Sequence, residues 1–353
     1  MKKVLSLVLA LVLVLGVAAA ASADGMYISV ISKGEQHAFW QAVRKGCEDA
    51  AAKYGVEMYY YGPPTEADIA LQVEALKGEM AKKPAAIALA ALSTESVMGE
   101  LQECVAQNIP VIGFDSGVPD APEGAIRSTV ATNNENAAAL AAEKFMEIEA
   151  FKAALTAATP EKPMTIACLS QDATSMSVSY RTTGFVNKMK ELAGAIGTVS
   201  VQGHALWADA TPVENPSIII HVEVGATAND SDLVNAANAV LNKDGLLAVF
   251  CSNEGTARAM LSATADGSEL GDGGRFADLI VAGFDAGITQ KNAVRNQWFV
   301  GAVTQDPYNI GFKSVEMAYK AASGEAVEDV DTGAKWYTYE NIDDPDIALL
   351  VYD

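Results

Sequence analysis

The sequence has few of the side chains that nucleophilic and acid–base catalysis commonly uses. Its 353 residues include only three histidines and four cysteines. The patterns G-x-S-x-G and H-E-x-x-H, which mark serine hydrolases and zinc peptidases, do not occur in it, and neither does the phosphate-binding P-loop. His204 stands in an irregular stretch, and His221 ends an apolar run. These shortages argue against most hydrolases and against nucleotide-hydrolysing enzymes.

Basic residues are also scarce. The sequence contains 24 lysines and arginines against 45 aspartates and glutamates, which gives a net charge of −21 at pH 7. Such a chain is repelled by the phosphates of nucleic acids and by anionic lipids. The composition therefore predicts no nucleic-acid partner, and a monomer is the expected state.

Long hydrophobic runs are limited to the N-terminus. Residues 4–20 are apolar, follow Lys2 and Lys3, and precede small residues that end at Ala23. This pattern is typical of a secretory signal peptide over residues 1–23. No cysteine lies near the junction to carry a lipid, so we expect a mature protein that is free in the periplasm. The alternative is an uncleaved anchor, because the run is at the short limit for crossing a bilayer.

The four cysteines show no metal-ligand spacing. Cys47 and Cys104 fall on the apolar stripes of two expected helices, whereas Cys168 and Cys251 fall within or at the end of expected strands. The helices that carry Cys47 and Cys104 should cover opposite faces of a sheet, which places these two cysteines too far apart for a disulfide. Buried free thiols are the leading interpretation, and pairing of Cys168 with Cys251 stays open.

Short apolar runs alternate with longer segments of helical period along the chain. This alternation predicts an α/β protein with two doubly wound, mainly parallel sheets, one in each of two lobes. The expected strands are 27–31, 57–61, 85–91, 111–114, 164–169, 217–222, 246–250, 279–284 and 300–303. The expected helices include 35–54, 66–82, 94–107 and 134–157.

The same three-residue motif, GFD, ends two distant apolar runs. Residues 109–117 read IPVIGFDSG and residues 279–287 read LIVAGFDAG, so Asp115 and Asp285 each stand where a buried strand meets a loop. Ligands of open α/β sheets bind beyond the carboxyl ends of the strands. We therefore expect both carboxylates to face one binding site, and expect alanine at either position to remove most binding. The alternative is that GFD is only a strand-ending turn.

A second group of polar and aromatic residues follows the first strand. Lys33 and His37 precede Phe39 and Trp40, which open a helix. Aromatic faces can lie on the C–H surface of a sugar ring, and Lys33 and His37 can donate hydrogen bonds to its hydroxyls. Both aromatic side chains could instead belong to the helix core. Adjacent helix positions point about 100° apart, which favours at least one of them in the site.

Five segments carry a family resemblance: KGEQHAFWQAVRKG at 33–46, the strand ends at Asp115 and Asp285, FCSNEGTARAM at 250–260, and VTQDPYNIG at 303–311. Together they resemble the type I periplasmic substrate-binding proteins of the ribose and galactose class, which serve ABC importers. The resemblance covers the whole sequence after the signal peptide. It implies three hinge strands, near Thr129, Asp306 and Thr332. The implied lobes are residues 24–129 plus 307–331, and residues 130–306 plus 332–353.

The resemblance also implies the binding residues. Phe39 and Trp40 are expected to stack on the sugar, and His37 is expected to touch it. The residues that match hydroxyl-binding positions are Asp115, Asn253, Asp285 and Gln305.

The sequence departs from the ribose-binding pattern at two cationic positions. Ser116 follows Asp115 where ribose binders have arginine, and Ser179 takes the other cationic position when Gly184 and Phe185 are matched. Arg181 then falls on a scaffold position. Lys33 could supply the missing charge and Asp172 a further acceptor, although both could equally be solvated loop residues. Ribose itself is therefore not the expected ligand.

These observations predict a soluble, non-enzymatic protein that captures a monosaccharide and delivers it to the permease of an ABC importer. A chemoreceptor is a further candidate partner, and no cofactor or metal is expected. A polyol, an inositol or a furanose signal resembling autoinducer-2 is the alternative ligand. A sugar-acting enzyme that uses Asp115 and Asp285 is a remote alternative. A sugar-responsive repressor would need a DNA-binding helix pair before Met26, where the signal peptide stands.

Overall fold

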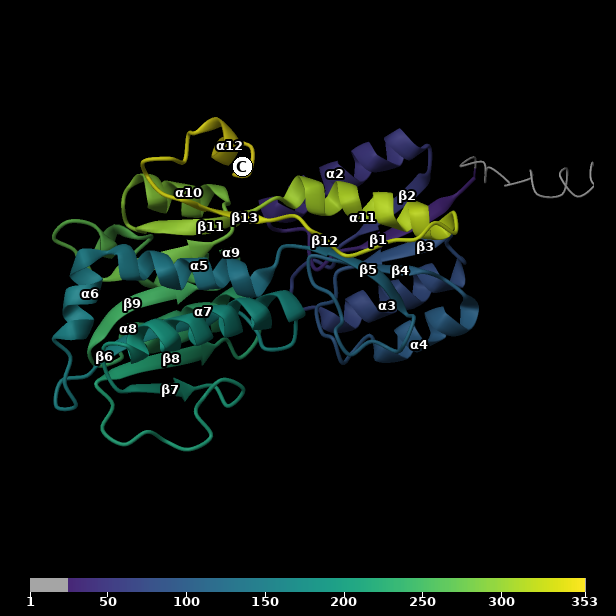
Figure 1. Ribbon diagram of the computed structural model, residues 1–353. Coiled ribbons are helices and arrows are strands. Elements are labelled where there is room, and N and C mark those ends of the chain that lie inside the picture. The colour runs from purple at the N-terminus through teal and green to yellow at the C-terminus, as the bar shows by residue number, and fades with distance from the viewer. Residues whose placement is uncertain (1–24, 353) are drawn as a thin grey trace, which may run out of the picture.

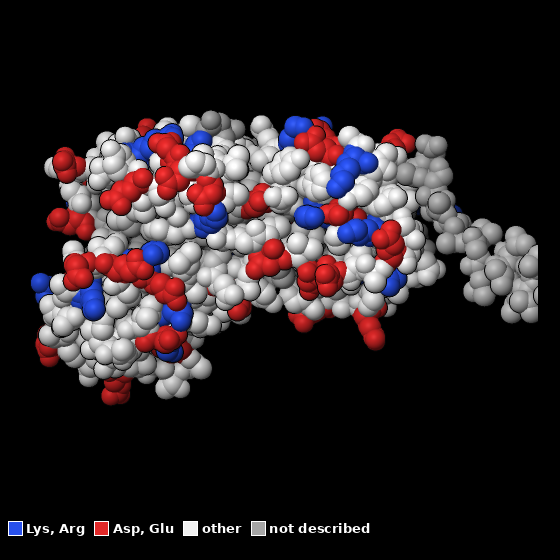
Figure 2. Space-filling view, turned by 45° about the horizontal axis from the view of Figure 1, so that its top comes forward, with Lys and Arg blue, Asp and Glu red and all other residues white. Residues whose placement is uncertain are grey.

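The computed structural model describes residues 25–352, so the predicted signal peptide lies outside the described residues. The chain forms two lobes side by side, each built on one mainly parallel sheet with helices on both faces (Figure 1). This is the α/β architecture that the sequence predicts. Figure 2 shows acidic side chains spread over both lobes on the face in view. Within the described residues, no helix combines the length and the hydrophobicity needed to span a bilayer.

The N-terminal lobe contains β1 (Tyr27–Ile31), β2 (Glu57–Tyr61), β3 (Ala86–Leu89), β4 (Val111–Phe114), β5 (Ile126–Ala131), β12 (Val330–Asp331), α2 (Ala38–Tyr54), α3 (Ile69–Ala81), α4 (Met98–Gln107) and α11 (Pro307–Ala322). The strand order is β12-β5-β4-β3-β1-β2, with all pairs parallel. Helices α2 and α11 cover one face, and α3 and α4 cover the other (Figure 1). Strands β3 and β4 are apolar throughout because both of their faces are buried.

The C-terminal lobe contains β6 (Met164–Ser170), β7 (Val199–Gly203), β8 (Ile218–Val224), β9 (Leu246–Cys251), β10 (Ile280–Phe284), β11 (Gly301–Gln305), β13 (Ala334–Tyr337), α5 (Asn134–Glu147), α6 (Glu149–Thr156), α7 (Met176–Gly194), α8 (Asp230–Leu241), α9 (Glu254–Ala263), α10 (Ile288–Arg295), α12 (Pro345–Ala348) and a short 3-10 helix (Ser268–Leu270). The strand order is β13-β11-β10-β9-β6-β8-β7, and β13 is antiparallel to β11. Helices α5, α6 and α7 pack on one face, and α8, α9 and α10 pack on the other.

Two elements of this lobe differ from the sequence prediction. The single helix expected over 134–157 is broken at Ile148, whose backbone is extended (φ −79°, ψ 111°). The break brings Phe145 and Phe151 into the same core, with their ring centroids 5.5 Å apart. Strand β7 was not predicted, because it is a five-residue edge strand in which Gln202 and Gly203 are exposed.

The cysteines are free and buried, as the leading interpretation predicts. Cys168 and Cys251 lie on neighbouring strands β6 and β9, where Cys168 is level with Phe250 and Leu169 is level with Cys251. Side chains that are one position apart on a strand point to opposite faces, and the two thiols belong to different cores. The sheet itself therefore separates Cys168 from Cys251 and excludes a disulfide between them.

Three crossings connect the lobes. Strand β5 stays in the N-terminal sheet up to Ala131, two residues beyond the predicted boundary. The second crossing runs from β11 into α11, and the third lies between β12 and β13. The first and third run together, because Thr132 Oγ1 donates to the Gly333 carbonyl at 3.1 Å and Asn133 N donates to Asp331 Oδ1 at 3.1 Å.

Close contact between α2 and α11 gives a stability prediction. A Cβ atom at Gly311 would stand 1.9 Å from the Val43 carbonyl oxygen, so the helices can approach this closely only with glycine there. We expect Gly311→Ala to destabilise the protein by about 3 kcal/mol. Gly78→Ala on α3, where a Cβ meets nothing within 4 Å, should instead stabilise it by about 0.5–1 kcal/mol. Equilibrium unfolding in urea measures both, and a shift of the same sign in the two variants would contradict this packing.

Candidate functional site

A narrow cavity of about 20 Å³ lies between the two lobes. The N-terminal lobe lines it with Lys33, His37, Phe39, Trp40, Glu66 and Asp115. The C-terminal lobe lines it with Val178, Arg181, Asn253, Glu254, Asp285 and Gln305. Eight of the ten residues predicted from the sequence are therefore brought together here.

The two GFD aspartates have the same backbone geometry. Asp115 and Asp285 follow β4 and β10 directly and adopt left-handed conformations, with φ of 53° and 77°. Each N–H donates to the carbonyl of the next strand, Val130 at 2.9 Å and Val303 at 2.7 Å. Aspartate tolerates this region better than most residues. The tight turn ends each strand at the cavity, where both side chains are more than nine-tenths buried.

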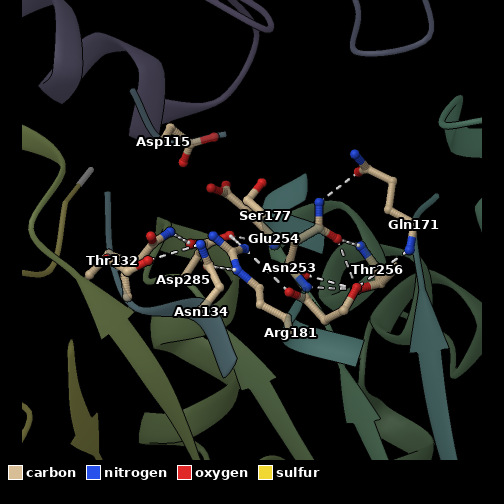
Figure 3. Close-up of polar contacts among 12 residues, drawn as sticks. Asp115, Thr132, Asn134, Gln171, Ser177, Arg181, Asn253, Glu254, Thr256 and Asp285 are labelled. Carbon is tan, nitrogen blue, oxygen red and sulfur yellow. Dashed lines mark hydrogen bonds and ion pairs between the residues drawn. The ribbon is translucent and has the colours of Figure 1, made fainter. Parts of the chain in front are cut away.

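The hydrogen bonds of the two aspartates differ, however. Both carboxylate oxygens of Asp285 are occupied. Oδ1 accepts from Gln305 Nε2 at 2.6 Å, and Oδ2 accepts from the Glu254 N–H at 3.0 Å and from Arg181 Nη1 at 3.4 Å. Asp115 Oδ2, in contrast, has no hydrogen-bond partner among the described residues. Figure 3 shows Asp115 set apart from the connected group around Asp285.

Arg181 is the cation of the C-terminal lobe. Its Nε donates to Asn134 Oδ1 at 2.8 Å and its Nη1 to the Ser252 carbonyl at 3.3 Å. The guanidinium also lies over the Phe284 ring, 3.8 Å from the centroid. These contacts, together with Asp285, hold the buried charge in one orientation at the cavity wall.

Lys33 supplies a cation to the N-terminal lobe. Its Nζ lies 3.4 Å from Asp115 Oδ2, an ion pair without hydrogen-bond geometry, and donates to Ser177 Oγ in the other lobe at 3.1 Å. Burial lowers the pKa of Lys33, but attraction by Asp115 and Glu66 outweighs burial, so the pKa is raised overall. The ammonium therefore stays charged next to Asp115, where Ser116 provides no cation.

The two aromatic residues are both core and cavity residues. Phe39 and Trp40 pack edge to face, with centroids 4.9 Å apart, and both line the cavity. Trp40 Nε1 donates to Glu66 Oε1 at 2.7 Å, and Gln171 Nε2 from the other lobe donates to Glu66 Oε2 at 2.7 Å. Burial raises the pKa of Glu66, but attraction by Lys33 and these hydrogen bonds outweigh it and lower the pKa to about 2.

His37 lies at the cavity rim and contacts the opposite lobe. Arg258 on α9 donates from Nη1 to His37 Nδ1 at 3.2 Å, which requires an unprotonated Nδ1. Burial lowers the pKa of His37, and the positive charge of Arg258 lowers it further against attraction by Glu66. Asp230 holds the Arg258 guanidinium with both of its oxygens, at 2.8 and 2.9 Å.

Hydrogen bonds join the lobes directly around the cavity. Besides the bonds from Gln171 to Glu66 and from Lys33 to Ser177, the Ser177 N–H donates to Ser116 Oγ at 3.3 Å and the Thr94 N–H donates to the Thr174 carbonyl at 3.1 Å. The structure thus shows the lobes closed on each other. Among the described residues, no group of histidine, cysteine and acidic side chains is arranged to hold a metal ion.

Comparison with known proteins decides the family. The family profile described as "Periplasmic binding protein domain" matches residues 28–326. The chain belongs to the periplasmic binding protein family. Comparison with curated protein sequences gave no match.

Solved structures of ABC transporter and carbohydrate transporter proteins cover nearly the whole chain. An "ABC transporter, LacI family transcriptional regulator" from Brachyspira murdochii is 40% identical, with a TM-score of 0.77, and covers 94% of this chain and 99% of its own. An ABC transporter solute-binding protein from Agrobacterium vitis with bound D-fucose is 26% identical, with a TM-score of 0.74, and covers 92% and 100%. A carbohydrate transporter solute-binding protein from Agrobacterium radiobacter in complex with D-arabinose is 24% identical, with a TM-score of 0.76, and covers 93% and 99%; it shows the shared fold.

Two residues predicted for the site of this periplasmic binding protein do not line the cavity. Asp172 accepts the N–H groups of Thr174 and Ser175 at 2.9 and 2.8 Å, and thereby shapes the loop before α7. Ser179 is half-buried on α7, next to Val178. Lining positions Val178 and Arg181 are three residues apart and share a helix face, whereas Ser179 is turned about 100° away. Arg181, which the sequence match places on a scaffold position, therefore lines the cavity, and Ser179 does not.

The sequence interpretation also missed Glu66, Val178, Arg181 and Glu254. Glu66 comes from the loop after the edge strand β2, and no repeated motif marks it. Glu254 had a usable signal, because it directly follows the predicted residue Asn253 close to the end of β9. Asn253, which was predicted, also caps α9, where its Oδ1 accepts from the Thr256 N–H at 3.1 Å.

Proposed function

We propose that this chain is the solute-binding protein of an ABC importer and that it captures a monosaccharide in the cavity between its lobes. The observation that carries the proposal is the cavity itself, which combines aromatic side chains with buried acceptors and cations from both lobes. Protein pockets for sugars need both components. Aromatic faces cover the C–H surface of a pyranose or furanose ring, and fixed polar groups pair with its hydroxyls.

The relative with bound D-fucose supports a sugar of similar size, since it covers nearly the whole chain at 26% identity. We assign the stacking role to Phe39 and Trp40, and the hydroxyl contacts to Asp115, Asn253 and Gln305. We propose His37 and Lys33 as donors to ligand oxygens. In this assignment Asp285 holds Arg181 and Gln305 in position and reaches the sugar through them.

Closure of the lobes around a ligand is the established motion of periplasmic binding proteins. A sugar held by both lobes stabilises the closed form in proportion to the contacts that the open form lacks. The hydrogen bonds from Gln171 to Glu66 and from Lys33 to Ser177 exist only when the lobes meet. We propose that the importer recognises this closed form. We also propose that the mature protein is a periplasmic monomer released by cleavage after Ala23, and that a chemoreceptor is a second partner.

Catalysis by the pair of Asp115 and Asp285 fits the site poorly. Glycoside hydrolysis needs one carboxyl group that gives up a proton and a second that acts as nucleophile or base. Both oxygens of Asp285 are held by Arg181, Gln305 and the Glu254 N–H, so this carboxylate is not available for either role. We therefore propose binding without turnover.

Thermal unfolding of the mature protein tests the proposal. D-Arabinose, D-fucose, D-tagatose and D-galactose are the probes, and mannitol serves as the polyol comparison. A sugar at 100 times its dissociation constant adds about 2.7 kcal/mol to the free energy of unfolding, so the melting temperature should rise by roughly 5 °C. Chromatography of the same samples should recover the sugar unchanged. No shift with any sugar, or conversion of a sugar, would contradict this function.

A further inference from the structure

Glu254 lies in the cavity wall at the start of α9, and its carboxyl also packs against Gly287. It is the first residue of α9, lines the cavity and is 9% exposed. Its backbone N–H donates to Asp285, but its Oε2 has no hydrogen-bond partner among the described residues. Figure 3 places Glu254 beside Asp285 and Asn253, with Asp115 set apart from this group.

The cavity wall contains three buried polar atoms of this kind, and all of them are acceptors. Asp115 Oδ2, Glu254 Oε2 and Gln305 Oε1 lack hydrogen-bond partners within residues 25–352. The amide of Gln305 cannot be turned round, because its nitrogen must face Asp285 Oδ1 at 2.6 Å. Buried acceptors without donors are costly and rare in folded proteins. These three acceptors therefore favour a ligand that donates hydrogen bonds in several directions.

The charges around Glu254 point the same way. Lys33 is paired with Asp115, Arg181 with Asp285, and Arg258 with Asp230. No ion pair to the Glu254 carboxyl occurs among the described residues. Burial and then repulsion by Asp285 raise the pKa of Glu254 to about 7, against the weaker pull of Arg258. Above that pKa, a negative group brought next to Glu254 would therefore meet carboxylates, while Lys33, Arg181 and Arg258 are already paired.

We propose that Glu254 contacts the ligand directly, that its Oε2 accepts a hydrogen bond from a ligand hydroxyl, and that it selects uncharged sugars against sugar acids of the same ring. This inference rests on the proposed function, because it takes the cavity to be a sugar site. Asp115 and Gln305 accept from other hydroxyls of the same molecule. The three acceptors lie just after β4, on α9 and on β11, so they contact hydroxyls of the ligand from both lobes.

Calorimetric titration of the wild type and Glu254→Gln at pH 8.5, where the Glu254 carboxyl is charged, tests the contact. The probes are the tightest binder among D-arabinose, D-fucose, D-tagatose and D-galactose, and its monodeoxyfluoro derivatives, in which fluorine cannot donate. In the wild type, replacing the hydroxyl that contacts Glu254 by fluorine should weaken binding by about tenfold or more. In Glu254→Gln that loss should shrink to within about threefold, because the charged acceptor is gone, while losses at the other positions persist. D-Galacturonate should bind the wild type far more weakly than D-galactose, and Glu254→Gln should narrow this gap.

Glu79→Gln is the matched control. Glu79 is 4% exposed on α3, and its carboxylate accepts from Tyr27 and Lys82, away from the cavity. This variant should keep the wild-type profile over all derivatives. If Glu254→Gln does not fold, Glu254→Asp serves instead. Its carboxylate is withdrawn by one methylene, so the unsubstituted sugar should bind more weakly and fluorine at the same hydroxyl should cost less affinity than in the wild type. An unchanged profile in the Glu254 variant overturns the inference alone, whereas no binding of any sugar by the wild type overturns the proposed function as well.

Discussion

Replacing Asp115 by alanine is expected to weaken sugar binding by about 100-fold while the protein stays folded. The side chain makes no hydrogen bond that holds the N-terminal lobe together, since its Oδ2 is unpartnered and its ion pair with Lys33 lies at the cavity. Its removal takes away an acceptor for the ligand. It also leaves the buried Lys33 ammonium without its counter-charge in the closed form, which disfavours closure. Both losses fall on binding rather than on folding.

Isothermal titration of Asp115→Ala and Asp115→Asn with the tightest sugar measures this effect, and circular dichroism checks the fold. Asparagine keeps one acceptor oxygen but removes the charge, so its loss of affinity should be intermediate. The melting temperature without sugar should change little in both variants. Wild-type affinity in Asp115→Ala would mean that GFD at this position is only a strand-ending turn.

Most of the fold was readable from the sequence for a simple reason. Strands buried on both faces, such as β3 and β4, appear as short uninterrupted apolar runs, and the helices between them show the 3.6-residue period. Edge strand β7 lacks such a run, because half of it faces solvent. The break at Ile148 was hidden for another reason. Residues on both sides are good helix formers, and only the packing of Phe145 on Phe151 requires the bend.

Most of the predicted residues that line the cavity either follow a strand end or open helix α2, as Phe39 and Trp40 do. Asp115, Asn253 and Asp285 stand directly after or close to the ends of central strands, a position that sequence reveals. Ser179 and Arg181 show the limit. Matching the trailing Gly184 and Phe185 fixes an offset along α7, but it does not fix which side of the helix faces the cavity. Glu66 reaches the cavity through tertiary contacts with Trp40 and Gln171 that no local pattern encodes.

The repeated GFD motif also shows that sequence alone does not fix the role of a residue. Its two copies share sequence, backbone angle and hydrogen bond to the next strand, so the sequence predicts equal roles for them. Their surroundings differ. Asp115 keeps an oxygen for a ligand, whereas Asp285 gives its oxygens to Arg181, Gln305 and the Glu254 N–H. The first copy is expected to act in binding, and the second mainly in building the wall of the site.

Asp285→Ala is therefore expected to lower the free energy of unfolding by about 3–5 kcal/mol, as well as to weaken binding. The variant leaves the 97% buried Arg181 guanidinium without its counter-charge and removes the acceptor for Gln305. For a protein of this size the melting temperature should fall by roughly 10 °C. Urea unfolding followed by tryptophan fluorescence measures the loss, with Asp115→Ala as the matched variant from the other lobe.

A double variant separates the charge from the packing. In Asp285→Ala/Arg181→Met both charges are gone, while methionine fills part of the space over Phe284. Removal of both members of a buried ion pair is commonly much less harmful than removal of one. The double variant should therefore recover about 1–3 kcal/mol relative to Asp285→Ala, which appears as a coupling energy in a double-mutant cycle. Strictly additive losses would show that Asp285 stabilises the lobe through Gln305 and the start of α9 alone, and that its pairing with Arg181 contributes nothing to folding.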